Sequence, residues 1–253
     1  MNVLTECLAQ GTSPVGVVSF AKEYLKQQGF EELYYNKMIS PKENSKYYIA
    51  PFPDVLFAFT TGAGKEMIQS LRMAFAHVDQ PCFKVKGKPD FKSMGCAMLN
   101  VEVYGGMMDH TWFDRPLGLA GTIVLKGEDV FNPIEVTYDS KRPVALIPGL
   151  AIHMQREANN GWKIDRQKEL MPLMGLANGR WTEDAFLHFL AEELSVDESE
   201  ILSYDLNLYN YDQPQLCGVK EGIWNRNRTG GSMAKKKFYA VRELIIWPLS
   251  VRC

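Results

Sequence analysis

Short apolar segments separated by glycine, proline and aspartate constrain the fold of this 253-residue chain more than any other feature. They are concentrated between Phe83 and Ile147, where Val101–Tyr104 and Gly121–Leu125 are clear examples. Runs of this length, bounded by turn residues, are typical of strands, whereas a helix needs a longer periodic segment. The sequence therefore predicts a β-rich domain in this part of the chain.

The residues before this domain predict a mixture of helix and strand. Ser13 and Pro14 are residue types favoured at the N-cap and first position of a helix, and Gly29 ends the apolar pattern that follows them. Three short apolar runs then predict sheet strands, at residues 47–49, 55–59 and 73–76. Helix signals return later, at residues 147–153 and in a capped segment at 182–194 that begins with Thr182.

Composition and charge exclude several classes of protein. Hydrophobic residues make up 46% of the chain, which excludes disorder, collagen and a coiled coil. A formal net charge of −2 provides no overall field for nucleic acid or an anionic membrane. No segment is apolar for the length of a membrane span, and the first residues lack a signal-peptide pattern, so we expect a cytoplasmic protein. Five cysteines occur singly, which favours neither a disulfide framework nor a zinc knuckle.

Two features invite a catalytic interpretation that their spacing does not support. Thr61–Lys65 resembles a phosphate-binding loop, but the glycine and the hydroxyl residue that such a loop requires are replaced by Phe59 and Glu66. A hairpin turn is the simpler interpretation. The adjacent pairs 31–32 and 192–193 are all glutamate, and we expect both pairs to lie on solvated helix faces near helix ends.

His77 and Asp79 form a more specific pattern. They are two residues apart directly after an apolar run, and alternate side chains of a strand share one face. Such an arrangement lets the imidazole bind a metal while the carboxylate orients the ring. The pattern by itself is a weak signal for a metal ligand, and it favours a hydrogen-bonded structural histidine.

Five segments in order resemble the aspartyl aminopeptidase family of zinc metallopeptidases. The first runs from Ala76 to Lys86 and contains both residues of that pattern. The others are Val101–Gly106, His110–Gly121, Ile147–His153, and Asp205–Tyr209 with Gln213–Pro214. The resemblance covers about residues 13–221.

The resemblance implies an α/β fold: the opening part of a zinc-aminopeptidase α/β catalytic domain, interrupted by an inserted β-rich oligomerisation domain. Residues 1–88 would belong to the catalytic domain, 89–213 to the inserted domain, and 214–221 would return to the first. In the family, two zinc ions share a water or hydroxide that attacks a peptide carbonyl. The resemblance further implies peptide substrates and a homo-oligomer, in which dimers assemble into a larger shell.

Three residues receive site roles from the resemblance. His77 would bind zinc, and Asp79 would orient His77. His153 corresponds to a family histidine that reaches the active site of a neighbouring subunit, where a donor stabilises the oxyanion. His110 lies in a family motif, but we interpret Trp112–Arg115 after it as framework and interface.

The resemblance ends near Glu221. The family continues with a Pro-Arg-Leu-Asp-Asn segment whose aspartate bridges both metals, whereas residues 222–253 form a divergent basic tail. Only four histidines occur in the chain, and three of them lie in the segment matched to the inserted domain. Because even one catalytic zinc normally takes three protein ligands, we expect a truncated chain that is inactive alone and binds zinc partially at most. The alternative is a non-catalytic oligomerisation module that dimerises or co-assembles with a full-length relative.

Overall fold

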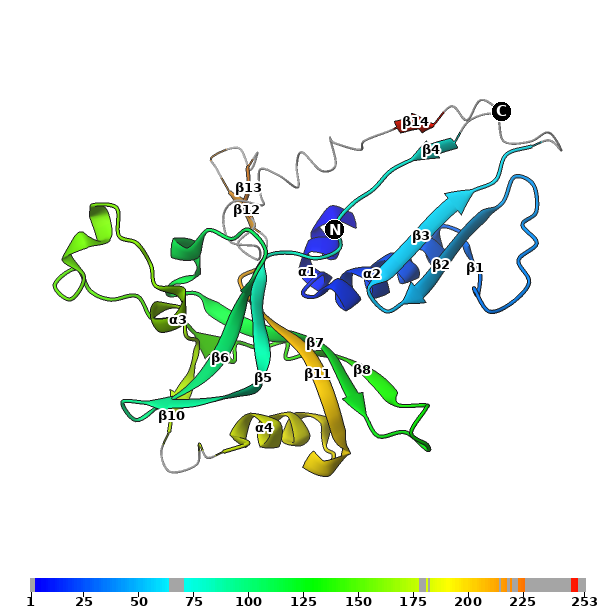
Figure 1. Ribbon diagram of the computed structural model, residues 1–253. Helices are drawn as coiled ribbons and strands as arrows, with labels where there is room; N and C mark the ends of the chain where they lie inside the picture. Colours follow the sequence, from blue (N-terminus) through cyan, green and yellow to red (C-terminus); the bar gives the residue numbers. More distant parts are fainter. Residues whose placement is uncertain are drawn as a thin grey trace. The chain divides into compact units, whose positions relative to one another are not determined.

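The computed structural model describes residues 3–63, 71–177, 181, 183–213, 215–217, 219, 223–225 and 247–249 (Figure 1). The chain divides into two compact units, residues 1–79 with 234–253 and residues 80–233. The predicted α/β fold class is confirmed, since helices and a small sheet form the first unit and a larger sheet dominates the second. Among the described residues, no helix is long and apolar enough to cross a membrane.

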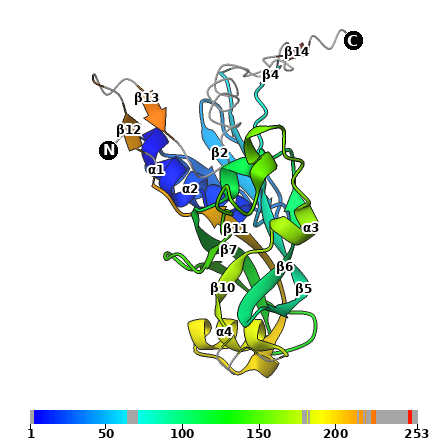
Figure 2. The ribbon, with the colours of Figure 1, turned by 90° about the vertical axis from the view of Figure 1, so that its left-hand side faces the viewer.

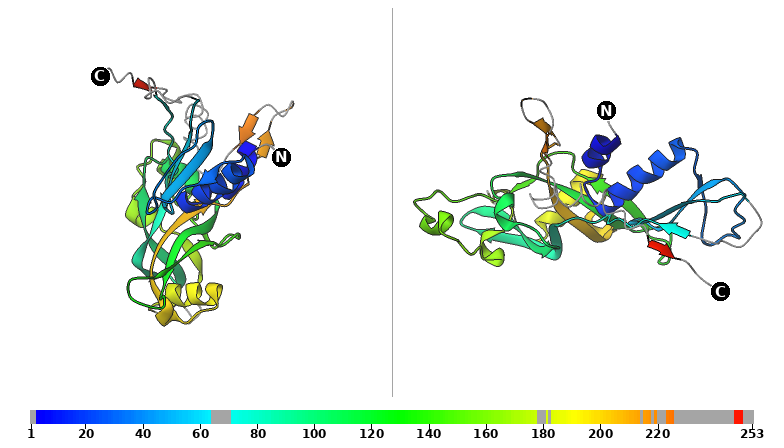
Figure 3. Two further views of the ribbon diagram at one scale, coloured as in Figure 1. Left: turned by 90° about the vertical axis from the view of Figure 1, so that its right-hand side faces the viewer. Right: turned by 90° about the horizontal axis from the view of Figure 1, so that it is seen from above.

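The first unit contains two helices and short strands. The helices are α1 (Val3–Gln10) and α2 (Pro14–Gln27); the strands are β1 (Glu31–Glu32), β2 (Lys46–Phe52), β3 (Val55–Thr60), β4 (Leu71–Met73) and β14 (Trp247–Leu249). β1 pairs in parallel with β2, and β2 pairs antiparallel with β3. Helix α2 runs beside this three-stranded sheet (Figure 3).

The start of helix α2 agrees with its prediction. The Ser13 hydroxyl accepts a hydrogen bond of 3.1 Å from the backbone N–H of Gly16, which satisfies one of the free amides of the first turn. Gly29 follows the helix with φ +78°, a conformation that favours glycine. Local capping therefore fixes both ends of this helix.

The predicted strands of the first unit are confirmed at 47–49 and 55–59, but the strand predicted at 73–76 is wrong except at Met73. β4 covers Leu71–Met73 and pairs antiparallel with β14, whereas residues 74–76 are not in a strand. The turn predicted at Thr61–Lys65 is only partly visible, because Gly64 and Lys65 lie outside the described residues. Thr61 is held by its backbone N–H, which donates to the Ser45 carbonyl at 2.9 Å.

The second unit is a closed β-sheet. Its main strands are β5 (Cys82–Ser93), β6 (Cys96–Tyr104), β7 (Pro116–Leu125), β8 (Ile134–Asp139), β9 (Ala145–Leu146), β10 (Leu173–Leu176) and β11 (Ile201–Asn210). The strand order is β11-β5-β6-β10-β9-β7-β8, and β11 pairs with β7 as well. This second pairing closes a barrel-like ring with β8 outside it, which confirms the predicted β-rich domain (Figure 2).

Short helices and two further strand pieces complete this unit. They are η1 (Asp109–Trp112), η2 (Arg156–Asn159), α3 (Arg166–Glu169), α4 (Ala185–Leu194), η3 (Glu198–Glu200), β12 (Gln215–Cys217) and β13 (Ile223–Asn225). β12 pairs with β13, so part of the predicted tail is a strand; residues 226–246 and 250–253 lie outside the described residues. The domain boundary predicted at residue 88 falls inside β5, and the domain assignment stays a prediction.

The core of the second unit joins the ring of strands to helix α4. Phe83, Leu119 and Leu206 from three strands are fully buried, as are Phe186 and Leu190 of α4. Burial of such side chains stabilises each by roughly 1.5–3 kcal/mol relative to an exposed position. Helix α4 is thus part of the core of this unit.

Helix α4 begins differently from its prediction. The helix starts at Ala185, after Asp184 in the left-handed conformation, and Thr182 lies outside the described residues. The carboxylate of Asp90 in β5 accepts a 2.9 Å hydrogen bond from the Phe186 backbone N–H. Burial raises the pKa of Asp90, although this hydrogen bond lowers it. A distant strand therefore supplies a cap that local sequence does not reveal.

The two glutamate pairs are not simply solvated helix faces. Glu31 and Glu32 form β1, and Lys22 of α2 binds the Glu32 carboxylate at 2.8 Å. In the other pair, Glu193 of α4 accepts hydrogen bonds from the Tyr138 hydroxyl at 2.7 Å and from Arg142 at 2.6 Å. The prediction was wrong for 31–32, which form a strand. Glu192 and Glu193 do lie near the end of α4 and are exposed, as expected, but the Glu193 carboxylate also has partners from other parts of the unit.

The Glu193 contacts predict an acid-sensitive contribution to stability. Burial raises the pKa of Glu193, but the hydrogen bonds from Arg142 and Tyr138 outweigh it, so the pKa lies below its ordinary value of 4.5. A lowered folded-state pKa stabilises the fold above the ordinary pKa, and this contribution is lost as the pH falls through the folded-state value. We expect Glu193→Gln to reduce the free energy of unfolding by about 1 kcal/mol at pH 7 and by almost nothing in strong acid.

Urea unfolding across the pH range checks this expectation. Glu192→Gln is the matched control, because Glu192 is the neighbouring residue and forms an exposed pair with His188 at 3.3 Å. A pH-independent difference for Glu193→Gln, or an equal effect of Glu192→Gln, would contradict it.

Candidate functional site

The predicted metal ligand and its orienting carboxylate are in contact. His77 Nδ1 lies 2.8 Å from Asp79 Oδ1, and the His77 side chain is 88% exposed. Both residues belong to an extended segment after β4 that forms no strand, so hydrogen bonding and not strand alternation brings them together. When Nδ1 donates its proton to the carboxylate, the lone pair of the ring is on Nε2, which is the tautomer that a metal requires.

These residues fit one ligand position of a zinc site and not a complete site. Within the described part of the chain, no group of three or more His, Cys, Asp or Glu side chains is arranged to hold a metal ion. A catalytic zinc needs three protein ligands and an open position.

His153 lies in the second unit, so the structure brings together only two of the three predicted site residues within one unit. It is exposed, in an irregular segment that runs from Pro148 to Ile164 and contains the short η2 helix. The helix predicted at 147–153 was wrong. The Ile147 carbonyl, which would accept the first bond of such a helix, instead accepts the Asp114 backbone N–H at 2.8 Å. The Gly149 backbone N–H donates to Asp114 Oδ1, also at 2.8 Å.

The larger side chains of the segment from Thr111 to Arg115 each contact another part of the second unit. Trp112 is 1% exposed and packs edge-on against Phe83 at 4.9 Å between ring centroids. Phe113 lies 5.4 Å from the ring of Trp162.

The two charged residues that follow bind distant parts of the same unit. Asp114 holds Gly149, and Arg115 donates to Asp212 Oδ2 at 2.9 Å and to the Thr111 carbonyl at 3.0 Å. These contacts support the framework interpretation of Trp112–Arg115.

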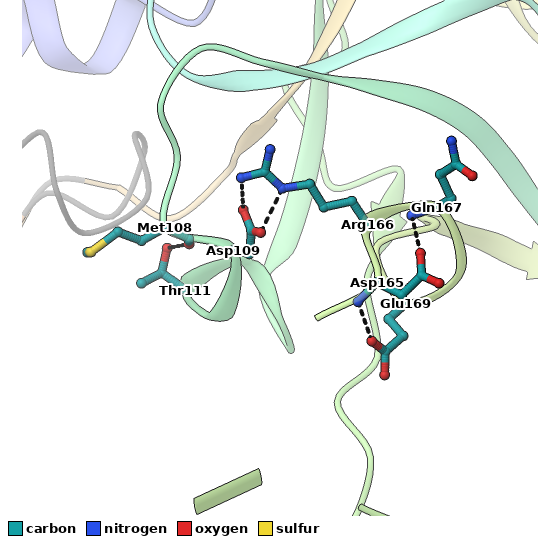
Figure 4. Close-up of polar contacts among 7 residues, drawn as sticks. All are labelled: Met108, Asp109, Thr111, Asp165, Arg166, Gln167 and Glu169. Carbon is teal, nitrogen blue, oxygen red and sulfur yellow. Dashed lines mark hydrogen bonds and ion pairs between the residues drawn. The ribbon is translucent and has the colours of Figure 1, made fainter. Parts of the chain in front are cut away.

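A bidentate ion pair holds the far end of the His153 segment. Arg166 of α3 donates to both carboxylate oxygens of Asp109 in η1, at 2.8 and 3.1 Å (Figure 4). This carboxylate raises the pKa of Arg166. The Asp165 carboxylate caps α3 through the Gln167 backbone N–H at 3.1 Å. Planar two-point pairing fixes direction as well as distance.

The other two histidines have different surroundings. His110 is exposed at η1. His188 of α4 contacts Glu198 at 2.8 Å and Glu192 at 3.3 Å, and the hydrogen bond with Glu198 raises its pKa. Sequence reasoning missed this cluster, although the spacing of His188 and Glu192 on a helix was a usable signal.

Comparison with known proteins agrees with the motifs on which the resemblance rests. A family profile described as aminopeptidase I zinc metalloprotease (M18) matches residues 7–229. The chain belongs to the M18 family of zinc metalloproteases. The match reaches eight residues beyond the point at which we expected the resemblance to end.

Curated M18 relatives extend the comparison. The chain is 34% identical over 229 residues to a probable M18 family aminopeptidase 2 of Clostridium novyi, which covers 90% of this chain and 53% of the relative. A Clostridium acetobutylicum protein with the same description is 34% identical over 227 residues, or 89% of this chain and 52% of the relative. The chain thus spans about half the length of the curated M18 proteins it matches.

Solved structures share the fold. A cryo-EM structure of an Ape4 and Nbr1 complex matches 87% of this chain and 47% of the other with a TM-score of 0.73 and 27% identity. The M18 aminopeptidase of Thermotoga maritima matches 87% and 49% with a TM-score of 0.68 at 20% identity, which is evidence for the fold alone.

Proposed function

We propose that this M18 chain takes part in the zinc-dependent removal of N-terminal residues from peptides, with His77 as one zinc ligand and Asp79 as the residue that orients it. The observation that carries the proposal is the 2.8 Å contact between His77 Nδ1 and Asp79 Oδ1, with the rest of the imidazole exposed. The family's description as a zinc metalloprotease supports zinc as the metal. We further propose a cytoplasmic location.

Assembly is the second element of the proposal. One structural relative is the mApe1 dodecamer of Saccharomyces cerevisiae. We propose that this chain also forms a homo-oligomer, in which His153 of one copy acts as a hydrogen-bond donor at the substrate site of another. Because the described residues supply one of several metal ligands, we expect the chain by itself to release no amino acid from a peptide.

Zinc binding tests the role of His77. We expect His77→Ala to lower the zinc affinity of the chain at least about tenfold and Asp79→Asn to lower it about 10–100-fold, since orienting carboxylates have effects of this size. Calorimetric titration with zinc measures both. His110→Ala is the matched control, an exposed histidine of the other unit. An equal loss of zinc affinity in the control, or no loss in His77→Ala, would contradict the proposal that His77 is a zinc ligand.

Activity tests the function as a whole. The chain is assayed on Asp, Glu and Leu amides with zinc, alone and with the part of the Clostridium novyi relative that it does not span. We expect chelator-sensitive release only in the second case, and none with His77→Ala. Release by the chain alone would show that our ligand count was wrong, whereas no release from a folded, zinc-loaded complex would reject catalysis.

A non-catalytic assembly module is the second candidate. It is favoured by the second unit, which has its own closed sheet and buried core. A stable oligomer that binds no zinc and gives no release with the complementary part would support it over the first candidate.

A further inference from the structure

The segment that carries His153 is exposed along its length but fixed at both ends. Leu150, Ile152 and Met154 flank the histidine and are 53%, 47% and 73% exposed. The backbone hydrogen bonds within the segment are confined to short turns, from Met154 and Gln155 to the Ala151 carbonyl at 2.8 and 3.1 Å and in η2. Its direction therefore depends on contacts at the two ends.

The first end is held by an unusual local geometry. Asp114 has φ +57°, and its carboxylate accepts the Gly149 backbone N–H at 2.8 Å. A Cβ at position 149 would collide with Asp114 Oδ2, so a side chain there would force the carboxylate to move. Aspartate and asparagine tolerate this left-handed conformation better than most residues. The Asp114 backbone N–H also donates to the Ile147 carbonyl at 2.8 Å. The backbone and the side chain of Asp114 therefore both bind this end of the segment.

The second end is held by the pair of Arg166 and Asp109. The Asp109 side chain is 18% exposed, and Arg166 donates to both of its carboxylate oxygens (Figure 4). The ring of Trp162 also rests on Phe113, next to Asp114. Both ends are therefore bound to the single stretch from Asp109 to Asp114.

We propose that Asp114 and Arg166 are positioning residues for His153, which clamp the ends of residues 148–164 so that the imidazole is presented in one preformed arrangement to a second copy of this chain. The proposal rests on the proposed function of His153. Preorganisation of this kind removes the entropy cost of ordering a loop at the moment of contact.

Hydrogen exchange of the full chain tests the clamp. Asp114→Gly keeps the left-handed backbone but loses the carboxylate, whereas Asp114→Asn keeps both the conformation and an acceptor oxygen. We expect exchange of the Gly149 amide to accelerate about three- to tenfold in Asp114→Gly and to return to the wild-type rate in Asp114→Asn. Asp129→Gly is the matched control, because it removes a similar bond to the Phe131 backbone N–H at 2.7 Å in another loop.

Photo-crosslinking tests the partner. Benzoylphenylalanine replaces Met154, next to His153, and crosslinked dimers are counted while light scattering reports the oligomer. We expect Asp114→Gly and Arg166→Gln to lower the yield several-fold at an unchanged oligomer size, and Asp114→Asn and Asp129→Gly to keep it.

The outcomes separate the clamp from the proposed function. Equal exchange and equal crosslinking in all variants would overturn the clamp, even in a chain that assembles. An Asp114-dependent exchange rate in a wild-type chain that stays monomeric and gives no crosslinked dimer would overturn the second copy as partner, and with it the proposed assembly.

Discussion

Gly121→Ala is expected to destabilise the second unit by about 3 kcal/mol or more, because overpacking and backbone strain act together at this position. Gly121 lies in β7 opposite Leu206 of β11, in the pairing that closes the ring of strands. A Cβ there would lie 2.0 Å from the Asp205 carbonyl oxygen, which is backbone and has little room to move. The residue also has φ +152°, which side chains rarely adopt.

A second glycine separates the two causes. Gly175 in β10 has a similar φ of +159°, but a Cβ there would meet no atom within 4 Å. We expect Gly175→Ala to lose only about 1 kcal/mol, which is the part due to backbone conformation. Urea unfolding followed by tryptophan fluorescence measures both variants. Equal losses would show that the approach of β7 to β11 is not the cause.

Trp112→Ala is expected to lower the free energy of unfolding of the same unit by about 3–5 kcal/mol, the usual cost of removing a large aromatic side chain from a core. Trp112 is 1% exposed and is in edge contact with Phe83. Its indole Nε1 has no hydrogen-bond partner among the described residues. The position therefore requires the volume of the ring and gains nothing from its N–H.

This difference makes phenylalanine a suitable control. Trp112→Phe removes the unpartnered N–H together with part of the ring, so we expect a smaller loss, about 1–2 kcal/mol. Thermal unfolding followed by circular dichroism gives both values. A loss with phenylalanine as large as with alanine would mean that the indole N–H has a partner, such as an ordered water.

The features predicted correctly from the sequence depend on residues close together along the chain. Ser13 caps α2 through Gly16, three residues away, and His77 contacts Asp79, two residues away. The short apolar runs of the second unit predicted strands, since turn residues bound each run. The motifs also predicted the family, which the M18 match over residues 7–229 confirms.

The features that the sequence did not predict depend on hydrogen bonds between residues that are far apart along the chain. Where a helix was expected at 147–153, the backbone N–H of Asp114, more than 30 residues earlier, instead takes the Ile147 carbonyl that would begin it. The cap of α4 comes from Asp90, 96 residues before Phe186. The partners of the exposed Glu193 carboxylate also come from far along the chain, since Tyr138 and Arg142 lie 55 and 51 residues before it. Periodicity and capping patterns report only neighbours along a helix or strand, so none of these contacts had a local signal.

By itself, the sequence determined the family, the β-rich character of the second unit and the local pairing of His77 with Asp79, because each depends on residue types at short fixed spacings. Only the tertiary structure decided how β11 pairs with both β5 and β7, and which side chains hold the segment that carries His153. The reason is physical: the free energy of these contacts comes from groups that meet only after the ring of strands has formed.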